Sequence, residues 1–176
     1  MDYITHYESP IGPLTLASDG QAITALLFDG ETYFDNAFGR VFEIIELSLE
    51  EAGELPAFAQ ALKWLDIYFS GKDPGFVPPI SLQLATPFCQ EVCEIMLTIP
   101  FGGTMSYGQI SDIIAKRRGI KKMAAQAVGG AVGRNPISLI VPCHRVIGTD
   151  GSLTGYGGGL DKKQKLLLLE GHTEYR

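Results

Sequence analysis

The first apolar pattern along the chain is that of paired strands. Two apolar runs in GPLTLASDGQAITALLF, residues 12–28, flank Asp19 and Gly20, a pair typical of a tight turn between antiparallel strands. The stretch YITHY, residues 3–7, precedes them. We predict a β-hairpin over residues 12–28 and a third strand over residues 3–7.

The apolar spacing changes to that of a helix over residues 56–70. The residues that recur at helical intervals are Phe58, Leu62, Leu65 and Phe69. Gly71 follows as a residue suited to end the helix. Residues 72–85 then combine a proline- and glycine-rich stretch with a candidate last strand. We therefore place a boundary at residues 84–86 and expect an N-terminal α/β domain over residues 1–85.

Residues 86–176 have the pattern of a second, mostly helical domain. Thr86 and Pro87 form a helix start. The apolar stripe behind them consists of Phe88, Val92, Ile95, Met96 and Ile99. Ser106 and Gln109 have the spacing of a capping box, which predicts a second helix with a buried isoleucine face.

Two further helices and a strand are predicted after a basic turn. Residues 121–133, KKMAAQAVGGAVG, form a short helix rich in alanine and glycine, so one face can approach another surface closely. With the preceding helix this suggests a helix-turn-helix, a pattern shared by other packed helix pairs. Residues 135–142, NPISLIVP, are predicted as a short buried strand, and residues 162–170 as a closing helix with a leucine-rich core face.

The composition is that of a globular protein in a reducing compartment. Of the 176 residues, 45% are apolar and 19% are charged, and no apolar run is long enough to span a bilayer. The N-terminus lacks the basic and apolar regions of a secretion signal, and three cysteines fit no closed set of disulfides. We therefore expect a cytoplasmic protein with free thiols and no membrane insertion.

The net charge of −6 is distributed unevenly. Residues 1–85 carry a net charge of −10 and residues 86–176 a net charge of +4. The clustered bases are Lys116, Arg117, Arg118, Lys121, Lys122 and Arg134. Such a cluster fits either a solvated helix face or a surface that binds the phosphates of a nucleic acid.

Cys143 is the cysteine whose neighbours suggest chemistry. It follows Pro142 and precedes His144 and Arg145, both of which can favour a thiolate over a thiol. For Arg145 we expect a structural ion pair rather than a catalytic role. The Gly-rich segment at residues 148–163, GTDGSLTGYGGGLDKK, is suited to packing against a flat ligand and lacks the motif of a phosphate-binding loop.

The other two cysteines, Cys89 and Cys93, are spaced four residues apart on a predicted helix. Small buried apolar side chains are the ordinary use of such cysteines. The spacing would also suit two metal ligands, but the sequence offers no evident third or fourth ligand. We expect no bound metal.

Four motifs in order, SYGQI, AVGGAVGRNPISLIVPCHRV, GYGGGL and LLLLEG, resemble the O6-alkylguanine-DNA alkyltransferases, also called methylated-DNA–protein-cysteine methyltransferases. The strong match runs from Thr104 to Gly171. The resemblance implies an α+β fold, with a small ribonuclease-H-like α/β domain followed by a helical, winged-helix-like domain containing a helix-turn-helix. It also implies a DNA repair protein that irreversibly transfers a methyl or other alkyl group from O6 of guanine, with O4 of thymine as a second candidate, to its own cysteine.

The resemblance assigns a role to each matching residue. Cys143 corresponds to the alkyl acceptor, His144 to the imidazole that takes the thiol proton through a water molecule, and Glu170 to the carboxylate that orients the imidazole. Tyr107 corresponds to the phenol that hydrogen-bonds the guanine. Asn135 corresponds to an asparagine that braces the segments around the site. The residues expected to line the base pocket are Val132, Val146, Tyr156 and Gly157, with the carbonyls of Cys143 and Val146 toward the guanine amino group and the amide of Gly157 toward O6.

The implied partner is double-stranded DNA that contains O6-alkylguanine. The family places its helix-turn-helix in the minor groove and extrudes the base. The matching DNA-binding residues are Lys121, Lys122, Ala125, Gln126, Ala127, Gly129 and Arg134. Gln126 stands where the family typically has an intercalating arginine, which predicts weaker DNA affinity or slower base extrusion. We expect a monomer that uses no cofactor and acts once.

Three alternatives remain open from sequence. The first is an alkyltransferase-like protein that binds the lesion with weak or no repair, which Gln126 favours and Cys143 opposes. The second is a helix-turn-helix regulator with an incidental thiol. The third is a cysteine hydrolase, for which only His144 of the three histidines lies near a candidate nucleophile.

Overall fold

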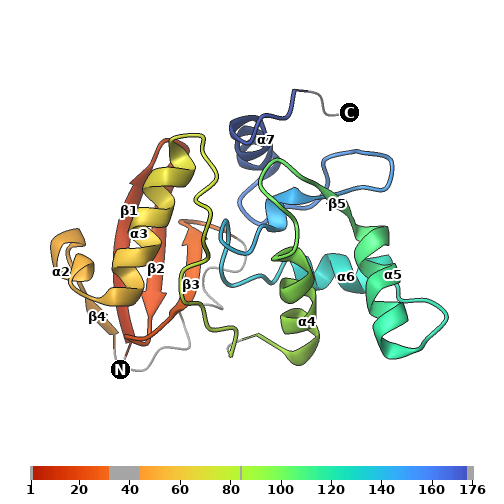
Figure 1. Cartoon of the computed structure of the whole chain (residues 1–176), viewed down its shortest axis with the longest axis horizontal. Coiled ribbons are helices and arrows are strands. Elements are labelled where there is room, and N and C mark those ends of the chain that lie inside the picture. Colours follow the sequence, from red (N-terminus) through yellow and green to blue (C-terminus); the bar gives the residue numbers. More distant parts are fainter. Residues whose placement is uncertain (1, 32–43, 84, 174–176) are drawn as a thin grey trace. The chain divides into compact units, whose positions relative to one another are not determined.

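The computed structural model describes residues 2–31, 44–83 and 85–173. Its chain forms two compact units, which we call the N-terminal and C-terminal units (Figure 1). The N-terminal unit comprises Met1–Leu84 together with Pro136–Ile140, and the C-terminal unit comprises Ala85–Asn135 and Val141–Arg176. Leu84, at the expected boundary, lies outside the described residues.

Within the described residues, the N-terminal unit is built on a four-stranded sheet. Its strands are β1 (Asp2–Ser9), β2 (Gly12–Ser18), β3 (Ile23–Phe28) and β4 (Ile44–Glu46). Their order is β3-β2-β1-β4, with β1/β2 and β2/β3 antiparallel and β1/β4 parallel. The predicted hairpin and third strand are therefore confirmed. Gly20 lies in the turn between β2 and β3 with a φ of 93°, a conformation that suits glycine.

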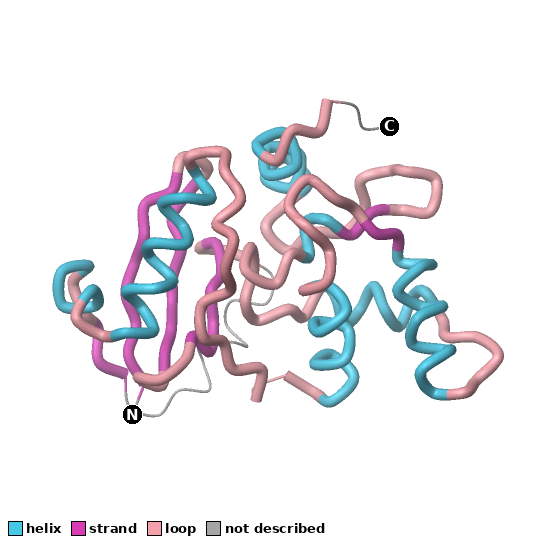
Figure 2. The backbone as a smooth tube through the Cα atoms, viewed as in Figure 1, coloured by secondary structure: helices cyan, strands magenta, loops and turns pink. Residues whose placement is uncertain are grey.

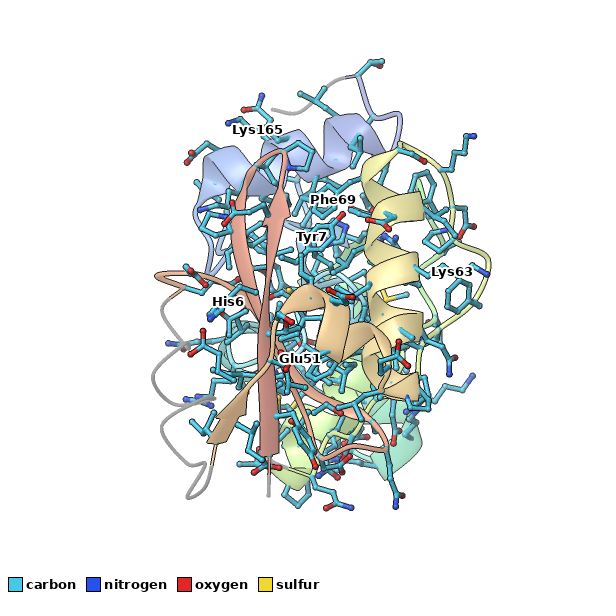
Figure 3. All side chains as sticks on the ribbon, turned by 90° about the vertical axis from the view of Figure 1, so that its left-hand side faces the viewer. His6, Tyr7, Glu51, Lys63, Phe69 and Lys165 are labelled. Carbon is cyan, nitrogen blue, oxygen red and sulfur yellow. The ribbon has the colours of Figure 1, made fainter. Side chains whose placement is uncertain are left out.

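Helix α3 (Pro56–Phe69) lies against this sheet and supplies much of the core, whereas the short α2 (Leu49–Gly53) lies near one edge (Figure 1). The buried face of α3 consists of Ala57, Phe58, Ala61, Trp64, Leu65 and Tyr68. Beyond this face, Phe69 stacks on Tyr7 of β1 with ring centroids 6.2 Å apart, and the two lie side by side in Figure 3. Gly71 follows the helix with a φ of 79°, as its predicted role at the helix end requires.

The predicted last strand of this unit is absent. Within residues 72–83, only Ile80 forms a bridge, to Ile23. Pro78 and Pro79 precede it and lack the N–H groups that a longer ladder would need.

The regular secondary structure of the C-terminal unit is mostly helical. Its elements are α4 (Pro87–Met96), β5 (Met105–Ser106), α5 (Tyr107–Arg118), α6 (Ala125–Val132), the 3-10 turn η1 (Cys143–Arg145), β6 (Val146–Ile147) and α7 (Leu160–Leu169). Thr86 caps α4, and Ser106 and Gln109 form the predicted capping box of α5. Helices α5 and α6 contact each other and α6 contacts α4, as expected for a helix-turn-helix. Figure 2 shows that most of the chain between α6 and α7 is loop.

The strand predicted over residues 135–142 is also wrong. Ile137 forms an isolated bridge to Leu26, and turns follow. Leu139 has a φ of 70°, which no strand residue adopts. The proline near each end of the stretch further limits a ladder.

No described helix is both long and apolar enough to cross a membrane.

Substituting Ser106 tests the local signal that starts α5. Ser106→Ala removes the hydroxyl that accepts from the Gln109 N–H at 3.1 Å, and we expect a loss of about 1 kcal/mol in the free energy of unfolding. Ser106→Thr, which restores a capping hydroxyl, should recover most of it. Chemical denaturation followed by circular dichroism measures both, and equal stability of the alanine variant and the wild type would contradict the cap's contribution.

Candidate active site

Cys143 begins a 3-10 turn in the interior of the C-terminal unit. Its side chain is 5% exposed. Its N–H donates to the carbonyl of Val141 at 2.8 Å, and its own carbonyl accepts from the N–H of Val146. The next strand, β6, pairs in parallel with β5 through Met105 and Val146. Because β5 leads directly into α5, this pairing brings the start of that helix near the cysteine.

His144 is fully buried and faces a carboxylate. Its Nε2 lies 2.7 Å from Oε1 of Glu170. Burial lowers the pKa of His144 by more than the carboxylate raises it, and the charges of Arg145 and Lys163 lower it further. A neutral imidazole that donates from Nε2 to Glu170 carries its basic lone pair on Nδ1. His144 can therefore accept a proton at Nδ1.

Arg145 holds the carboxylate from the other side. Its Nε donates to Oε2 of Glu170 at 2.9 Å, its Nη2 donates to Oε1 at 3.0 Å, and its Nη1 donates to the carbonyl of Ile99 at 2.7 Å. The expected structural ion pair of Arg145 is confirmed.

Glu170 is a buried carboxylate that stays ionised. The N–H of Gly102 adds a further donor to its Oε2 at 3.1 Å. Burial alone would raise the pKa of Glu170, but the hydrogen bonds and charges of His144 and Arg145 lower it to about 2. Its negative charge can thus stabilise positive charge that develops on His144.

Tyr107 is the first residue of α5. Its hydroxyl lies 3.1 Å from the carbonyl of Thr154 and 3.3 Å from that of Gly155, so it donates to this loop. Burial raises the pKa of Tyr107, and its electrostatic interaction with Cys143 raises the pKa further. The phenol therefore stays protonated as a hydrogen-bond donor.

Asn135 links the end of α6 to the approach to the cysteine. Its Nδ2 donates to the carbonyl of Val141 at 2.8 Å, and its Oδ1 lies 3.9 Å from Sγ of Cys93. This hydrogen bond ties the residue just beyond α6 to the residue two positions before Cys143.

Cys89 and Cys93 are buried on α4 as small core side chains, as predicted. The thiol of Cys89 faces the carbonyls of Ala131 and Arg134 at 3.4 and 3.6 Å. Across the described ranges, no three His, Cys, Asp or Glu residues are arranged to hold a metal ion.

Lys163 is a buried site residue that sequence reasoning missed. It is 0% exposed, and its Nζ donates to the carbonyls of Val146 and Thr154 at 2.5 and 2.8 Å. Burial lowers its pKa to about 8, although its electrostatic interaction with Cys143 acts in the opposite direction. Its spacing from the buried Leu166 and Leu167 places it on the core face of α7. That helical spacing is the signal that would have separated it from the neighbouring solvated lysines.

The predicted base-pocket residues occupy several positions in the C-terminal unit. Val132 is buried at the end of α6, and Val146 is buried in β6 with its carbonyl already accepting from Lys163. Tyr156 and Gly157 are half-buried in the loop before α7.

The predicted DNA-binding residues include an exposed cluster at the start of α6. Ala125, Gln126 and Ala127 are exposed there, as are Lys121, Lys122 and Arg134 near its two ends. Gly129 is half-buried, and a β-carbon at this position would lie 3.9 Å from the ring of Tyr107.

Two arginines of the basic cluster serve the fold. Arg118 donates to Glu91 of α4 at 2.6 Å and lies 5.2 Å from the ring centroid of Phe88. Arg117 lies 3.9 Å from Glu94. These contacts tie the end of α5 to α4 and partly neutralise both arginines.

Two family profiles match this chain and together cover most of it. The profile described as "6-O-methylguanine DNA methyltransferase, ribonuclease-like domain" matches residues 3–82, and that of the DNA-binding domain of the same protein matches residues 87–172. The chain belongs to the 6-O-methylguanine DNA methyltransferase family. Its α+β fold is that of the family, with a ribonuclease-like N-terminal and a DNA-binding C-terminal domain.

Relatives in this family cover nearly the whole chain. The methylated-DNA–protein-cysteine methyltransferase of Mycobacterium leprae is 46% identical over 165 residues, which are 94% of this chain and 90% of the relative. The protein of the same name from Mycobacterium bovis is 45% identical over 169 residues, 94% of this chain and 92% of the relative. A crystal structure of Mycobacterium tuberculosis OGT in complex with DNA superposes with a TM-score of 0.76 at 39% identity, covering 96% of this chain and 92% of that one.

Acid should destabilise this family member through the buried charge cluster. The folded-state pKa of His144 lies below its ordinary 6.5 and that of Glu170 falls from 4.5 to about 2. Both groups therefore bind fewer protons in the folded chain than in the unfolded chain, so the free energy of unfolding falls as the pH drops below 6.5 and then from 4.5 toward 2. The Glu170 shift corresponds to roughly 3 kcal/mol.

Chemical denaturation of the whole chain at a series of pH values measures this dependence. Glu170→Gln should be less stable at neutral pH, because Arg145 loses its counter-charge, and should lose less stability between pH 4.5 and 2. Glu8→Gln, at an exposed carboxylate, serves as the control. An acid dependence in Glu170→Gln identical to that of the wild type would contradict the assignment.

Proposed function

We propose that this chain is a DNA repair protein that transfers an alkyl group from O6 of guanine irreversibly to Sγ of Cys143. Its relatives bear the name methylated-DNA–protein-cysteine methyltransferase, which supports the reaction. One observation carries the assignment of residues: His144, which directly follows the buried Cys143, is itself buried and paired with Glu170. Of the three cysteines, Cys143 alone has a histidine next to it in the chain, and that histidine supplies the base.

In the proposed reaction, a water molecule passes the Cys143 proton to Nδ1 of His144, because adjacent residues seldom hydrogen-bond directly. Glu170 stabilises the imidazolium that forms. The thiolate then attacks the alkyl carbon, the new S–C bond forms as the C–O6 bond breaks, and the electron pair of that bond remains on the guanine. No redox partner or cofactor enters this balance.

Tyr107 is proposed to neutralise the departing guanine. Its protonated hydroxyl would donate to the guanine ring and stabilise the negative charge left by the broken C–O6 bond. A phenol has one proton, so its bond to the loop carbonyl at Thr154 or Gly155 must be exchanged for the base. Lys163 would keep the Thr154 carbonyl hydrogen-bonded during this exchange.

The proposed substrate is O6-alkylguanine in double-stranded DNA, with O4-alkylthymine as a second candidate. The small exposed residues at the start of α6 suit a helix lying deep in the minor groove, with the base extruded at a cost of about a few kcal/mol. Lys121, Lys122 and Arg134 are proposed to contact phosphates. We propose that the protein acts as a monomer in the cytoplasm. It is consumed in one turnover, because ordinary reductants do not reverse the thioether that forms on Cys143.

Incubation with an oligonucleotide duplex containing O6-methylguanine tests the transfer directly. Intact-protein mass spectrometry should show a mass gain of one methylene per chain. Mass spectrometry of the digested protein should find that gain only on the peptide with Cys143. Cys143→Ser should show no gain and Cys89→Ser a normal one, because Cys89 is a core residue. Lesion binding without any mass gain would instead indicate the alternative of a lesion-binding protein, and neither binding nor transfer would indicate an incidental thiol.

Gln126 is expected to limit the extrusion step. Gln126→Arg should bind duplex DNA more tightly and raise the rate of repair in duplex, since a guanidinium adds a cationic contact and can stack on bases. We expect a change of roughly tenfold, about 1.4 kcal/mol. Gln126→Lys provides a matched control that adds charge without a planar group. Unchanged duplex affinity and rate in the arginine variant would contradict a limiting role for Gln126.

A further inference from the structure

We propose that Glu31 and Ser138 form an anchor that positions the segment leading to Cys143, which makes both of them positioning residues for alkyl transfer. The proposal rests on the proposed function for its kinetic consequence and on the contacts of the N-terminal unit for its structural basis. Neither residue belongs to the site described above.

The anchor begins with the backbone of β3. The N–H of Leu26 donates to the carbonyl of Pro136 at 2.9 Å, and the N–H of Ser138 donates to the carbonyl of Leu26 at 2.7 Å. Ile137, between these two residues, is thereby paired with Leu26 in an isolated bridge. These bonds use main-chain atoms alone and do not depend on the side chain at position 138.

A buried carboxylate adds a side-chain contact to this bridge. The hydroxyl of Ser138 lies 3.1 Å from Oε1 and 3.2 Å from Oε2 of Glu31, so it donates to the carboxylate. The N–H of Phe28 donates to Oε2 at 3.1 Å. Glu31 is 6% exposed and Ser138 is 1% exposed. Because a buried carboxylate is costly unless hydrogen bonds satisfy it, the pair strongly favours one orientation of Ser138.

The orientation of Ser138 is transmitted along a short, constrained path. Leu139 follows it with a φ of 70°, a strained conformation for a residue with a side chain. The N–H of Ile140 donates back to the carbonyl of Ser138 at 2.9 Å. Strain of this kind persists only where the surroundings hold it, and the Glu31–Ser138 pair holds the residue immediately before Leu139.

The path ends at the reactive cysteine. The carbonyl of Val141 accepts one hydrogen bond from Nδ2 of Asn135 at 2.8 Å and another from the N–H of Cys143, also at 2.8 Å. The hydrogen bond between Asn135 and Val141 therefore joins the two ends of the segment formed by residues 136–140. The contact of Ser138 with Glu31 holds the middle of that segment. Loss of the middle contact should loosen the turn that carries the thiol while leaving the Asn135 contact in place.

The test compares Ser138→Ala, Glu31→Gln and the double variant with the wild-type chain. Two quantities are measured: hydrogen exchange of the peptide spanning residues 137–146, without DNA, and the single-turnover rate of methyl transfer at saturating duplex. Glu51→Gln is the matched control, since Glu51 is an exposed carboxylate in the same unit that also accepts from a backbone N–H, that of Ser48. Exchange of the α3 peptide and of the α4 peptide reports whether each of the two units remains folded.

In Ser138→Ala we expect exchange of the 137–146 peptide to become about tenfold faster, with the α4 peptide unchanged. The transfer rate should fall about tenfold, while the DNA concentration needed for half-saturation stays constant. Glu31→Gln, which keeps an acceptor for Ser138, should show a smaller effect. The double variant should be no slower than the worse single variant, because the two residues act as one contact.

Unchanged exchange at residues 137–146 in Ser138→Ala would overturn the anchor. Faster exchange with an unchanged transfer rate would overturn its role in positioning the thiol, as would equal acceleration in the α4 peptide, which indicates general destabilisation. If the wild-type protein transfers no methyl group, the proposed function fails, and the exchange measurement still decides whether the anchor exists.

Discussion

The Glu170 carboxylate is buried, ionised and shared between His144 and Arg145, the two residues that follow Cys143. Removing a carboxylate from water is costly, and it is tolerated here because His144, Arg145 and the Gly102 N–H all donate to it. The guanidinium supplies the balancing positive charge. For this reason His144 can remain neutral in a fully buried position, which is the state that a proton acceptor requires.

That charge cluster also joins distant parts of the C-terminal unit. Arg145 reaches the carbonyl of Ile99, just beyond α4, and Glu170 at the end of α7 receives the Gly102 amide. Lys163 in α7 donates to the carbonyl of Val146 in β6 and to that of Thr154 within the loop before that helix. The same buried donors that satisfy the carboxylate therefore fix the turn of Cys143, so stability and the proposed chemistry rest on shared contacts.

The helices and the hairpin could be predicted from sequence because their signals are local. The capping box of Ser106 and the glycine at position 71 act within one helical turn of their elements. The two strands predicted wrongly, within residues 72–85 and over residues 135–142, contain apolar runs beside prolines. Over residues 135–142 the apolar character correctly indicated burial, but burial does not require a ladder, and the prolines and Leu139 prevent one. Within residues 72–83 the apolar run did not indicate burial either, since Val77 is 57% exposed.

The sequence by itself determined the Pro-Cys-His-Arg-Val motif, the family to which the chain belongs and the residues proposed for the site. Cys143, His144 and Arg145 are adjacent in the chain, so their association needs no fold. Only the tertiary structure decided that Arg145 is bound to Glu170, that Lys163 is buried and that Ser138 meets Glu31. These pairings join residues far apart in the chain, and no periodicity or spacing encodes which distant donor will satisfy a buried acceptor.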